Sequence, residues 1–256
     1  MIPGVTTIYG EPGTCKTSLA LTWPKPIAFY DLENGGRRAW GIDKLIADNV
    51  VQKRTITIPL KSLTKRYDKL DGYKAAWDSF TSQVSHDLDS KVFSTIVWDT
   101  GTLIWSLVRD AFLEERQIER PNKKTLDTIE YAEPNRRMTT LYQLIKAYEV
   151  HLVVTHHSKD EYVPELAANK PIKDDQGNVK MIQSGNKLPD GFKETLALSD
   201  LVLYTRLENN NIPHVLVTKS LYGLDLRGQD IEWPEYKKLD SRIDFFRGGA
   251  YYETQK

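Results

Sequence analysis

Short apolar runs, each followed by a turn or a polar residue, recur along the chain and predict the strands of a sheet. Residues 5–9 lead into a glycine-rich turn, and residues 26–31 form an apolar run that ends in an acid. A strand without polar alternation is typical of a parallel sheet that is covered on both faces. The predicted strands are residues 5–9, 26–31, 55–58, 93–99, 151–155, 201–207 and 214–219.

Segments with helical spacing separate most of these strands. In residues 72–88, one face of the predicted helix carries Tyr73, Ala76, Trp77 and Phe80. The other helices are predicted at residues 18–21, 37–46, 103–117 and 127–148, the last of them kinked or started at Pro134. This alternation predicts an α/β fold with a mostly parallel twisted sheet and helices on both faces.

The C-terminal half departs from the alternation in three places. The run of asparagines at 209–211 joins the last two strands, which predicts an antiparallel hairpin. Residues 159–194 lack periodicity and are rich in Pro, Gly, Asn, Asp and Lys, so we expect a long mobile loop. The aromatic and charged tail, residues 223–256, indicates no particular element. We expect a single domain over residues 1–256.

The composition fits one large domain. The 256 residues, 40% of them hydrophobic and 27% charged, suffice for a full core. No apolar run approaches the roughly 20 residues of a membrane span, and no signal peptide precedes the first strand. The single cysteine excludes internal disulfides and cysteine-rich zinc sites. We therefore expect a cytoplasmic protein without a membrane partner.

The formal net charge is zero, which gives no global indication of a nucleic-acid-binding protein. Residues 53–74 are an exception, because this stretch contains seven lysines and arginines but only two acids, Asp68 and Asp71. This basic stretch predicts either a solvated surface segment or a phosphate-binding patch, and the sequence leaves both readings open.

Residues 10–17 fit the phosphate-binding loop pattern G-x-x-x-x-G-K-[ST] with one substitution. Small residues let backbone N–H groups turn inward around a phosphate, and the following helix directs its positive end at it. Lys16 would add a positive charge for the β- and γ-phosphates, and Thr17 a hydroxyl for Mg²⁺. An ordinary turn would not need a Lys-Thr pair at this offset. The predicted ATP-binding residues are Gly10, Glu11, Pro12, Gly13, Thr14, Cys15, Lys16, Thr17 and Ser18.

Cys15 stands at the one position where the pattern has a glycine. If the loop requires a positive φ at this position, a cysteine would be strained there and a glycine would not. The sequence alone does not give the angle.

The strand predicted at residues 93–99 ends in Asp99. An apolar strand that ends in an acid, downstream of a phosphate-binding loop, indicates a second magnesium ligand opposite Thr17. The alternative is that Asp99 caps the helix predicted after it. The sequence thus predicts ATP and Mg²⁺ as cofactors, with Thr17 and Asp99 as the metal ligands.

This order of motifs resembles the RecA-like ATPases, and most closely in size and layout the phage-encoded RecA-like single-strand annealing proteins of the Sak group. The resemblance covers roughly residues 5–219, and its most specific part is the phosphate-binding loop. In that family the second core strand ends in an acid-x-Glu element whose glutamate orients the attacking water. Asp31-Leu32-Glu33 matches this element, so the resemblance implies a catalytic Glu33. A surface loop acid is the alternative.

The resemblance implies two further site residues. The fourth core strand of the family ends in a polar residue that senses the γ-phosphate, and His156 fits it, or His157 if the strand runs one residue longer. Both histidines could instead be ordinary residues at the start of a loop. Lys219 fits a lysine that reaches the nucleotide of the neighbouring subunit, with Arg206 and Arg227 as rivals. The predicted catalytic residues are Glu33, Lys16, His156 and Lys219.

The function that the resemblance implies is an ATP-binding and ATP-hydrolysing DNA recombination protein. Such a protein binds single-stranded DNA and promotes annealing or strand exchange. Residues 159–194 match the DNA-binding loop of the family. The resemblance also implies a homo-oligomer, ring or filament, with the nucleotide at the subunit interface, a single-strand binding protein as a further partner, and the host cytoplasm if the protein is phage-encoded.

Two other functions remain open from the sequence. A P-loop ATPase of another branch, such as a helicase loader or a partition-type motor, would be stimulated by a protein partner instead of DNA. A small-molecule kinase would need arginines near a substrate acid, although the acid-x-Glu element argues against it. Candidate arginines are Arg109, Arg116, Arg120, Arg136 and Arg137.

Overall fold

The computed structural model describes residues 3–59, 70–167, 170–174, 176–208, 211–223 and 226–239. Lys61, Lys65, Arg66 and Lys69 of the basic stretch and the end of the C-terminal tail lie outside these ranges. No helix within them is both long enough and apolar enough to cross a membrane.

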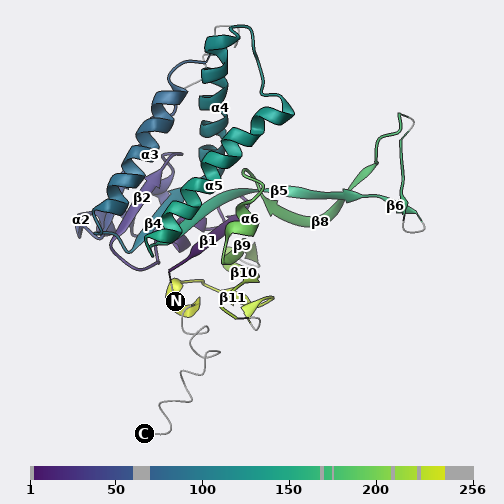
Figure 1. Cartoon of the computed structure of the whole chain (residues 1–256). Helices are drawn as coiled ribbons and strands as arrows, with labels where there is room; N and C mark the ends of the chain where they lie inside the picture. Colours follow the sequence, from purple (N-terminus) through teal and green to yellow (C-terminus); the bar gives the residue numbers. More distant parts are fainter. Residues whose placement is uncertain are drawn as a thin grey trace.

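The strands and helices alternate over the first half of the chain, as predicted (Figure 1). The strands are β1 (Val5–Gly10), β2 (Ile27–Asp31), β3 (Val51–Arg54), β4 (Thr95–Asp99), β5 (His151–Pro164), β6 (Leu166–Ala167), β7 (Lys170–Pro171), β8 (Met181–Pro189), β9 (Leu201–Glu208), β10 (Ile212–Ser220) and β11 (Asp230–Glu232). The helices are α1 (Lys16–Ala20), α2 (Ile42–Ala47), α3 (Tyr73–Asp89), α4 (Gly101–Glu119), α5 (Ala132–Ala147) and α6 (Thr195–Leu198), with 3-10 turns η1 (Gly36–Arg38) and η2 (Thr128–Tyr131).

The main sheet has the strand order β11-β10-β9-β1-β5-β4-β2-β3. All neighbours from β9 to β3 pair in parallel, whereas β10 is antiparallel to both β9 and β11. This confirms the predicted mostly parallel sheet and its C-terminal hairpin. Because parallel strands point the same way, the residues that follow β1, β2, β4 and β5 gather at one edge of the sheet.

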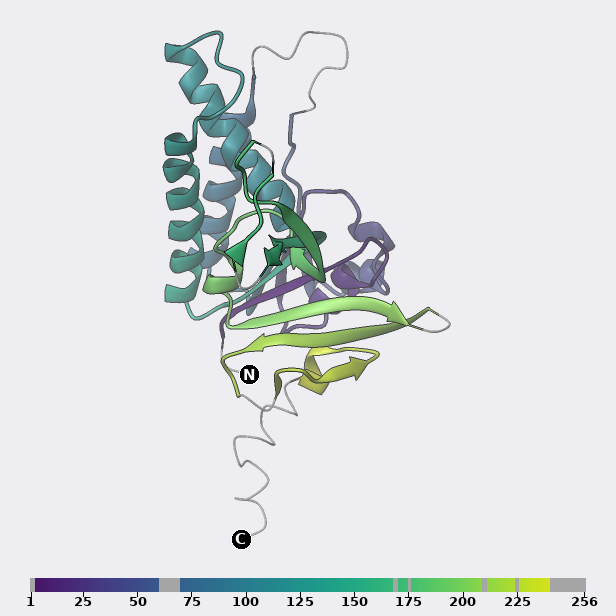
Figure 2. The same ribbon diagram turned by 90° about the vertical axis from the view of Figure 1, so that its right-hand side faces the viewer.

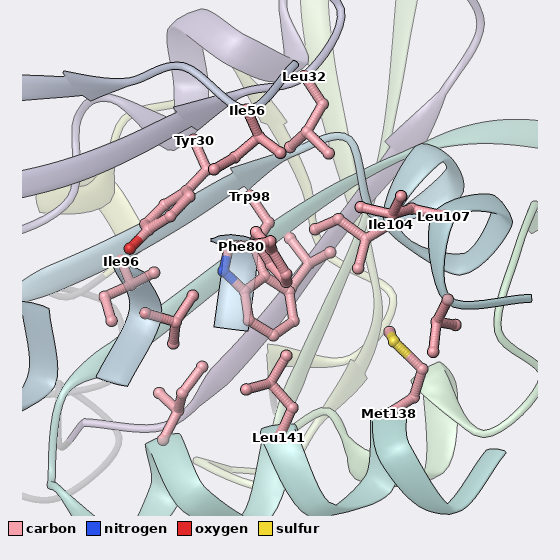
Figure 3. Packing of buried hydrophobic residues seen from close by; sticks show 14 of the residues in the cluster. Tyr30, Leu32, Ile56, Phe80, Ile96, Trp98, Ile104, Leu107, Met138 and Leu141 are labelled. Atoms are coloured by element: carbon pink, nitrogen blue, oxygen red, sulfur yellow. The ribbon is translucent and has the colours of Figure 1, made fainter. Parts of the chain in front are cut away.

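Side chains of the strands alternate between two hydrophobic clusters, one on each face of the sheet. In β2, Ala28 and Tyr30 belong to the first cluster, and Ile27 and Phe29 to the second. The first cluster packs beneath α3, α4 and α5, which form one layer in Figure 2. Figure 3 shows the residues that these helices contribute, among them Phe80 from α3, Ile104 and Leu107 from α4, and Leu141 from α5. Burial on both faces explains why these strands lack polar alternation.

The strand predicted at residues 55–58 is wrong, because the third strand is β3, four residues earlier in the chain. Pairing between β2 and β3 ends at Tyr30 and Arg54, so residues 55–58 lie outside the hydrogen-bonded ladder. Ile56 is buried in the first hydrophobic cluster and not in the sheet. The alternation of Thr and Ile in residues 55–58 therefore reflects the packing of Ile56 beside the sheet and not a strand within it.

Residues 159–194, predicted as a loop without regular structure, contain an antiparallel β-ribbon. Strand β5 continues past the sheet to Pro164, and β8 returns along it from Met181 to Pro189. This ribbon, residues 158–189, is referred to below as the arm, and it extends away from the body of the molecule (Figure 1). Both faces of the arm are largely exposed, so its strands carry polar residues and give no apolar run.

A buried ion pair joins α3 to the sheet. The Asp87 carboxylate, with no exposed side-chain surface, accepts hydrogen bonds from Arg54 Nε (2.9 Å), Arg54 Nη2 (2.8 Å) and the Tyr30 hydroxyl (2.7 Å). Burial raises the pKa of Asp87, but the bonds from Arg54 and Tyr30 outweigh it and hold the pKa below its ordinary value. The carboxylate therefore stays charged and links α3 to β2 and β3.

Replacing Asp87 by Asn is expected to lower the free energy of unfolding by about 2–4 kcal/mol, because Arg54 would lose its charged partner in a largely buried site. Asp78→Asn is the matched control, since Asp78 on the same helix pairs with Lys74 at the surface; its effect should stay within about 1 kcal/mol. Urea unfolding checks this, and equal midpoints for the two variants would contradict it. Because the native pKa of Asp87 is depressed, its contribution is complete above the ordinary carboxyl pKa and disappears as pH falls through the native pKa.

Candidate functional site

The phosphate-binding loop connects the end of β1 to the start of α1 at the edge where the parallel strands end. A Cβ atom on Gly10 would lie 2.3 Å from the Thr205 carbonyl oxygen on β9, so only glycine fits there. Gly13 has φ +82°, a value that glycine adopts without strain. The sequence pattern therefore corresponds to a tight turn packed against the neighbouring strand.

Cys15 has φ 64° and ψ 20°, which is the left-handed conformation. The loop therefore does require a positive φ at this position, and a cysteine is strained there. The Cys15 thiol is free and exposed, and the residue lines the pocket described below.

Lys16 lies folded into the loop. Its Nζ donates hydrogen bonds to the carbonyl oxygens of Gly10 (2.9 Å) and Glu11 (2.7 Å). Burial lowers the pKa of Lys16, while the negative charges of Asp99 and Glu33 act in the opposite direction. A cation held by neutral carbonyl groups is available to exchange them for the oxygens of a phosphate.

Asp99, at the end of β4, connects three elements. The Thr17 hydroxyl on α1 donates to Asp99 Oδ2 at 2.9 Å, and the Thr155 hydroxyl on β5 donates to Asp99 Oδ1. Asp99 is 3% exposed, and this burial raises its pKa. A carboxylate and a hydroxyl that meet beside a phosphate-binding loop fit the oxygen ligands that Mg²⁺ prefers.

The cap of the following helix is Thr100 and not Asp99. The Thr100 side chain accepts a hydrogen bond from the backbone N–H of Leu103 at the start of α4. The alternative role that the sequence allowed for Asp99 is therefore wrong, and Asp99 lines the pocket instead.

The loop after β2 places Glu33 opposite the phosphate-binding loop. Asp31 shapes this loop by accepting hydrogen bonds from the backbone N–H groups of Gly35 (3.0 Å) and Gly36 (3.1 Å), and it pairs with Lys53 at 2.7 Å. Glu33 Oε1 lies 2.6 Å from His157 Nε2. Within the acid-x-Glu element, Asp31 thus fixes the backbone of the loop, and Glu33 lines the pocket.

The two neighbouring histidines face opposite sides of β5. His157 lines the pocket with Glu33, whereas His156 is 1% exposed and its Nδ1 lies 2.8 Å from the Asp190 carbonyl oxygen. Burial lowers the pKa of His156 to about 4, so its ring is neutral at pH 7. Of the two residues that the sequence offered, the structure brings His157 to the pocket.

These side chains enclose a pocket of about 310 Å³. Among the residues predicted to bind ATP, all from Pro12 to Ser18 line it, while Gly10 and Glu11 do not. Arg38 and Ala39 also line it, and no sequence motif had indicated them. The complete lining is Pro12, Gly13, Thr14, Cys15, Lys16, Thr17, Ser18, Glu33, Gly35, Arg38, Ala39, Asp99, Thr100 and His157.

None of the three residues proposed to act on a neighbouring subunit lines this pocket. Lys219 Nζ donates to the carbonyl oxygens of Leu196 (2.7 Å) and Ala197 (3.3 Å) on α6, and burial lowers its pKa. Because β10 is antiparallel to β9, Lys219 lies at the end of the sheet opposite the pocket. Arg206 pairs with Glu208 and Asp230, and Arg227 is exposed.

A second cleft, of about 740 Å³, lies on the other side of the first turn of α4. Thr100 lines the pocket, and Thr102 lines this cleft. The Arg109 guanidinium lies over the Trp105 ring, 5.6 Å from its centre. The lining combines aromatic rings with cations: Thr102, Trp105, Ser106, Arg109, Thr128, Tyr131, Asn135, Lys159, Asp190, Gly191 and Lys193.

The sequence matches the family described as an AAA domain over residues 3–227, and the chain belongs to this family. No protein of curated function matches the sequence. Among solved structures, the fold is similar to that of a KaiC-like protein from the hyperthermophilic archaeon Pyrococcus horikoshii OT3. The two chains share 12% identity over 91% of this chain and 90% of that chain, with a TM-score of 0.47.

Family membership, the phosphate-binding loop and the parallel sheet together define the class of the protein. It is a P-loop ATPase of the AAA type, with the mostly parallel α/β core that the sequence predicts, while its RecA-like character stays a prediction. The closer resemblance to the Sak group stays a prediction, as do the roles of individual site residues.

Replacing Cys15 by Gly is expected to raise the free energy of unfolding by about 0.5–1 kcal/mol, because glycine adopts the left-handed conformation without the steric cost. Cys15→Ala is the matched control, since alanine also lacks the thiol but keeps a Cβ atom in that conformation. Urea unfolding of the three proteins measures the difference. A glycine variant no more stable than the alanine variant would contradict a strained loop.

Proposed function

We propose that the protein binds Mg²⁺ and ATP in the pocket and hydrolyses ATP to ADP and phosphate. The observation that supports this most directly is the convergence on one pocket of Lys16 at the start of α1, Asp99 at the end of β4 and Glu33 in the loop after β2. A cation for the phosphates, a metal-binding carboxylate and a second carboxylate for water are the groups that phosphoryl transfer requires.

Thr17 and Asp99 would hold the magnesium ion, and the bound ion would neutralise charge that develops on the phosphate oxygens. Their contact of 2.9 Å places a hydroxyl and a carboxylate oxygen together at the pocket. Thr155 holds the other carboxylate oxygen, which fixes the orientation of Asp99. In this role Lys16 turns from the loop carbonyl groups to the phosphates.

Glu33 is the proposed base. It would accept a proton from water as the water oxygen attacks the γ-phosphorus and the bond to ADP breaks. His157, 2.6 Å from the Glu33 carboxylate, would hold that carboxylate before ATP binds and contact the γ-phosphate afterwards. This assigns the sensor to His157 in place of His156, which is buried on the other side of β5.

We further propose that the protein acts on single-stranded DNA, in annealing or strand exchange, and that the second cleft binds the strand. Sequence-independent binding of single strands uses cations for the backbone and aromatic rings for the bases. Arg109, Lys159 and Lys193 supply the cations, and Trp105 and Tyr131 the rings. The cleft adjoins the ATP pocket through the first turn of α4, which would link DNA binding to ATP turnover.

A homo-oligomer, ring or filament, with ATP between subunits belongs to this proposal, as does a single-strand binding protein as a further partner. Trp40 is 90% exposed directly after two residues that line the pocket, Arg38 and Ala39. A large exposed ring beside an open nucleotide pocket is suited to contact with a neighbouring subunit. Lys219 stays a prediction for contact with a neighbour's nucleotide.

One observation favours a protein-stimulated ATPase as a second function. The arm carries about as many acids as lysines and exposes apolar side chains, among them Tyr162 (55% exposed) and Leu166 (58% exposed). Exposed apolar surface is more typical of a protein-binding site than of a nucleic-acid-binding one. ATP turnover with and without single-stranded DNA distinguishes the two functions. A protein that acts on single-stranded DNA should be stimulated by it, whereas a protein-stimulated ATPase should not.

Glu33→Gln is expected to retain Mg·ATP binding and to lower the turnover number by roughly 10²–10⁴-fold, because the amide keeps the shape but accepts no proton. Lys16→Ala is the comparison, and it should lose binding itself. Equilibrium binding and single-turnover hydrolysis, measured on both, separate the two effects. Near-normal hydrolysis by Glu33→Gln would show that another group activates the water.

Trp105→Leu is expected to weaken single-stranded DNA binding by roughly 5- to 100-fold, the range for loss of one stacked base. Arg109→Gln and Lys193→Gln should weaken binding to all sequences alike and make it less dependent on salt. Arg136→Gln is the control, because this exposed arginine pairs with Glu133 and does not line the cleft. Titrations at several salt concentrations test this. Unchanged binding in the three cleft variants would exclude the cleft.

A further inference from the structure

Glu11 places a carboxylate within the loop that is proposed to bind the phosphates of ATP. A carboxylate repels the phosphates of Mg·ATP unless its charge is compensated or directed elsewhere. Glu11 lies next to Gly10 within the phosphate-binding loop, and its backbone carbonyl accepts the Lys16 hydrogen bond at 2.7 Å. The backbone of Glu11 is thus part of the nucleotide site, while its side chain does not line the pocket.

The arm holds the Glu11 carboxylate. Lys187 Nζ, on β8, lies 3.0 Å from Glu11 Oε1, and the Ser158 hydroxyl, at the start of the arm on β5, donates to the same oxygen at 2.9 Å. Both strands of the arm therefore contact one loop residue. These bonds lower the pKa of Glu11, which keeps its carboxylate ionised and bound to the arm.

Lys187 is itself held in place by the arm. Asp160, on the opposite strand and paired with Lys187 in the ribbon, lies 2.8 Å from Lys187 Nζ. The ammonium group is thus shared between an arm carboxylate and a loop carboxylate. A lysine fixed at one end by its own ribbon can position the group at its other end.

We propose that Lys187 is a positioning residue of the nucleotide site, which acts through Glu11. It compensates the charge of the Glu11 carboxylate and keeps that side chain outside the pocket, so that the loop receives the phosphates without a competing anion. This inference rests on the proposed binding of ATP at the phosphate-binding loop. It makes the arm part of the nucleotide site as well as an extension of the sheet.

The expected effect is modest, because the network is partly solvated. The exposed fraction of the side chain is 34% for Lys187 and 51% for Glu11. Ion pairs with this degree of exposure contribute at most about 1 kcal/mol, which corresponds to a change in affinity of no more than roughly five-fold. Salt screens such pairs, so the change should shrink as ionic strength rises.

The test is a double-mutant cycle on ATP affinity with the full-length protein. Lys187→Met, which keeps the length of the side chain, is expected to raise the Kd for Mg·ATP roughly two- to five-fold. In a Glu11→Gln background the same change should have little effect, because no loop charge is left to compensate. Lys187→Arg should restore most of the affinity, which a merely structural role of the aliphatic stem would not require.

Lys180→Met is the matched control. Lys180 lies further along the arm and forms a similar ion pair with Glu165, at 2.6 Å, but does not contact the loop. Its replacement should leave ATP affinity unchanged. The loss in Lys187→Met should appear in Kd and KM and not in turnover at saturating ATP, because Lys187 does not touch the reacting atoms.

Lys16→Ala distinguishes the two levels of the proposal. If Lys16→Ala loses ATP binding while Lys187→Met binds as the unmodified protein does, the loop binds ATP and the inference about Lys187 is overturned. An equal loss in Lys187→Met with and without Glu11→Gln would also overturn it. If Lys16→Ala binds ATP normally, the proposed nucleotide site itself fails.

Discussion

The candidate site depends on one buried carboxylate, that of Asp99. Asp99 accepts hydrogen bonds from the hydroxyl groups of Thr17 on α1 and Thr155 on β5. It therefore joins the helix that follows the phosphate-binding loop to two central strands, β4 and β5. A buried carboxylate is costly unless hydrogen bonds or a cation compensate it. Two hydroxyl groups do so only in part, since burial still raises the Asp99 pKa. The arrangement is therefore well suited to a cation at the same place.

The pleat of the sheet distributes functions between neighbouring residues. Successive side chains on a strand point to opposite faces, so His157 faces Glu33 and the pocket while the buried His156 faces the Asp190 carbonyl oxygen. The Thr102 hydroxyl donates to the Asp190 carbonyl oxygen at 2.9 Å and accepts from the His157 N–H at 3.2 Å. The two sites are thus in direct contact through hydrogen bonds at the base of the arm.

The arm adds a second connection between distant parts of the chain. Its two strands contact the phosphate-binding loop through Glu11, and Asp190, which directly follows the arm, contacts α4. A two-stranded ribbon has little stability of its own in water. The contacts at its base therefore hold the arm to the body of the molecule together with β5, which continues into it from the main sheet. Through them, a change at the nucleotide site has a physical route to the arm.

Local patterns in the sequence determined the fold class and the phosphate-binding loop, because apolar periodicity and the Gly–Lys–Thr spacing act over a few residues. Asp99 became a candidate from the apolar run that it ends, whereas Glu33 became one only from the resemblance of Asp31-Leu32-Glu33 to an acid-x-Glu element. The sequence could not choose between His156 and His157, since strand register is set by pairing with β1. Nor could it predict β3, the arm or the Glu11–Lys187 pair, because these depend on contacts between segments far apart in the chain. Tertiary structure decided them, since burial and pairing partners exist only once the chain has folded.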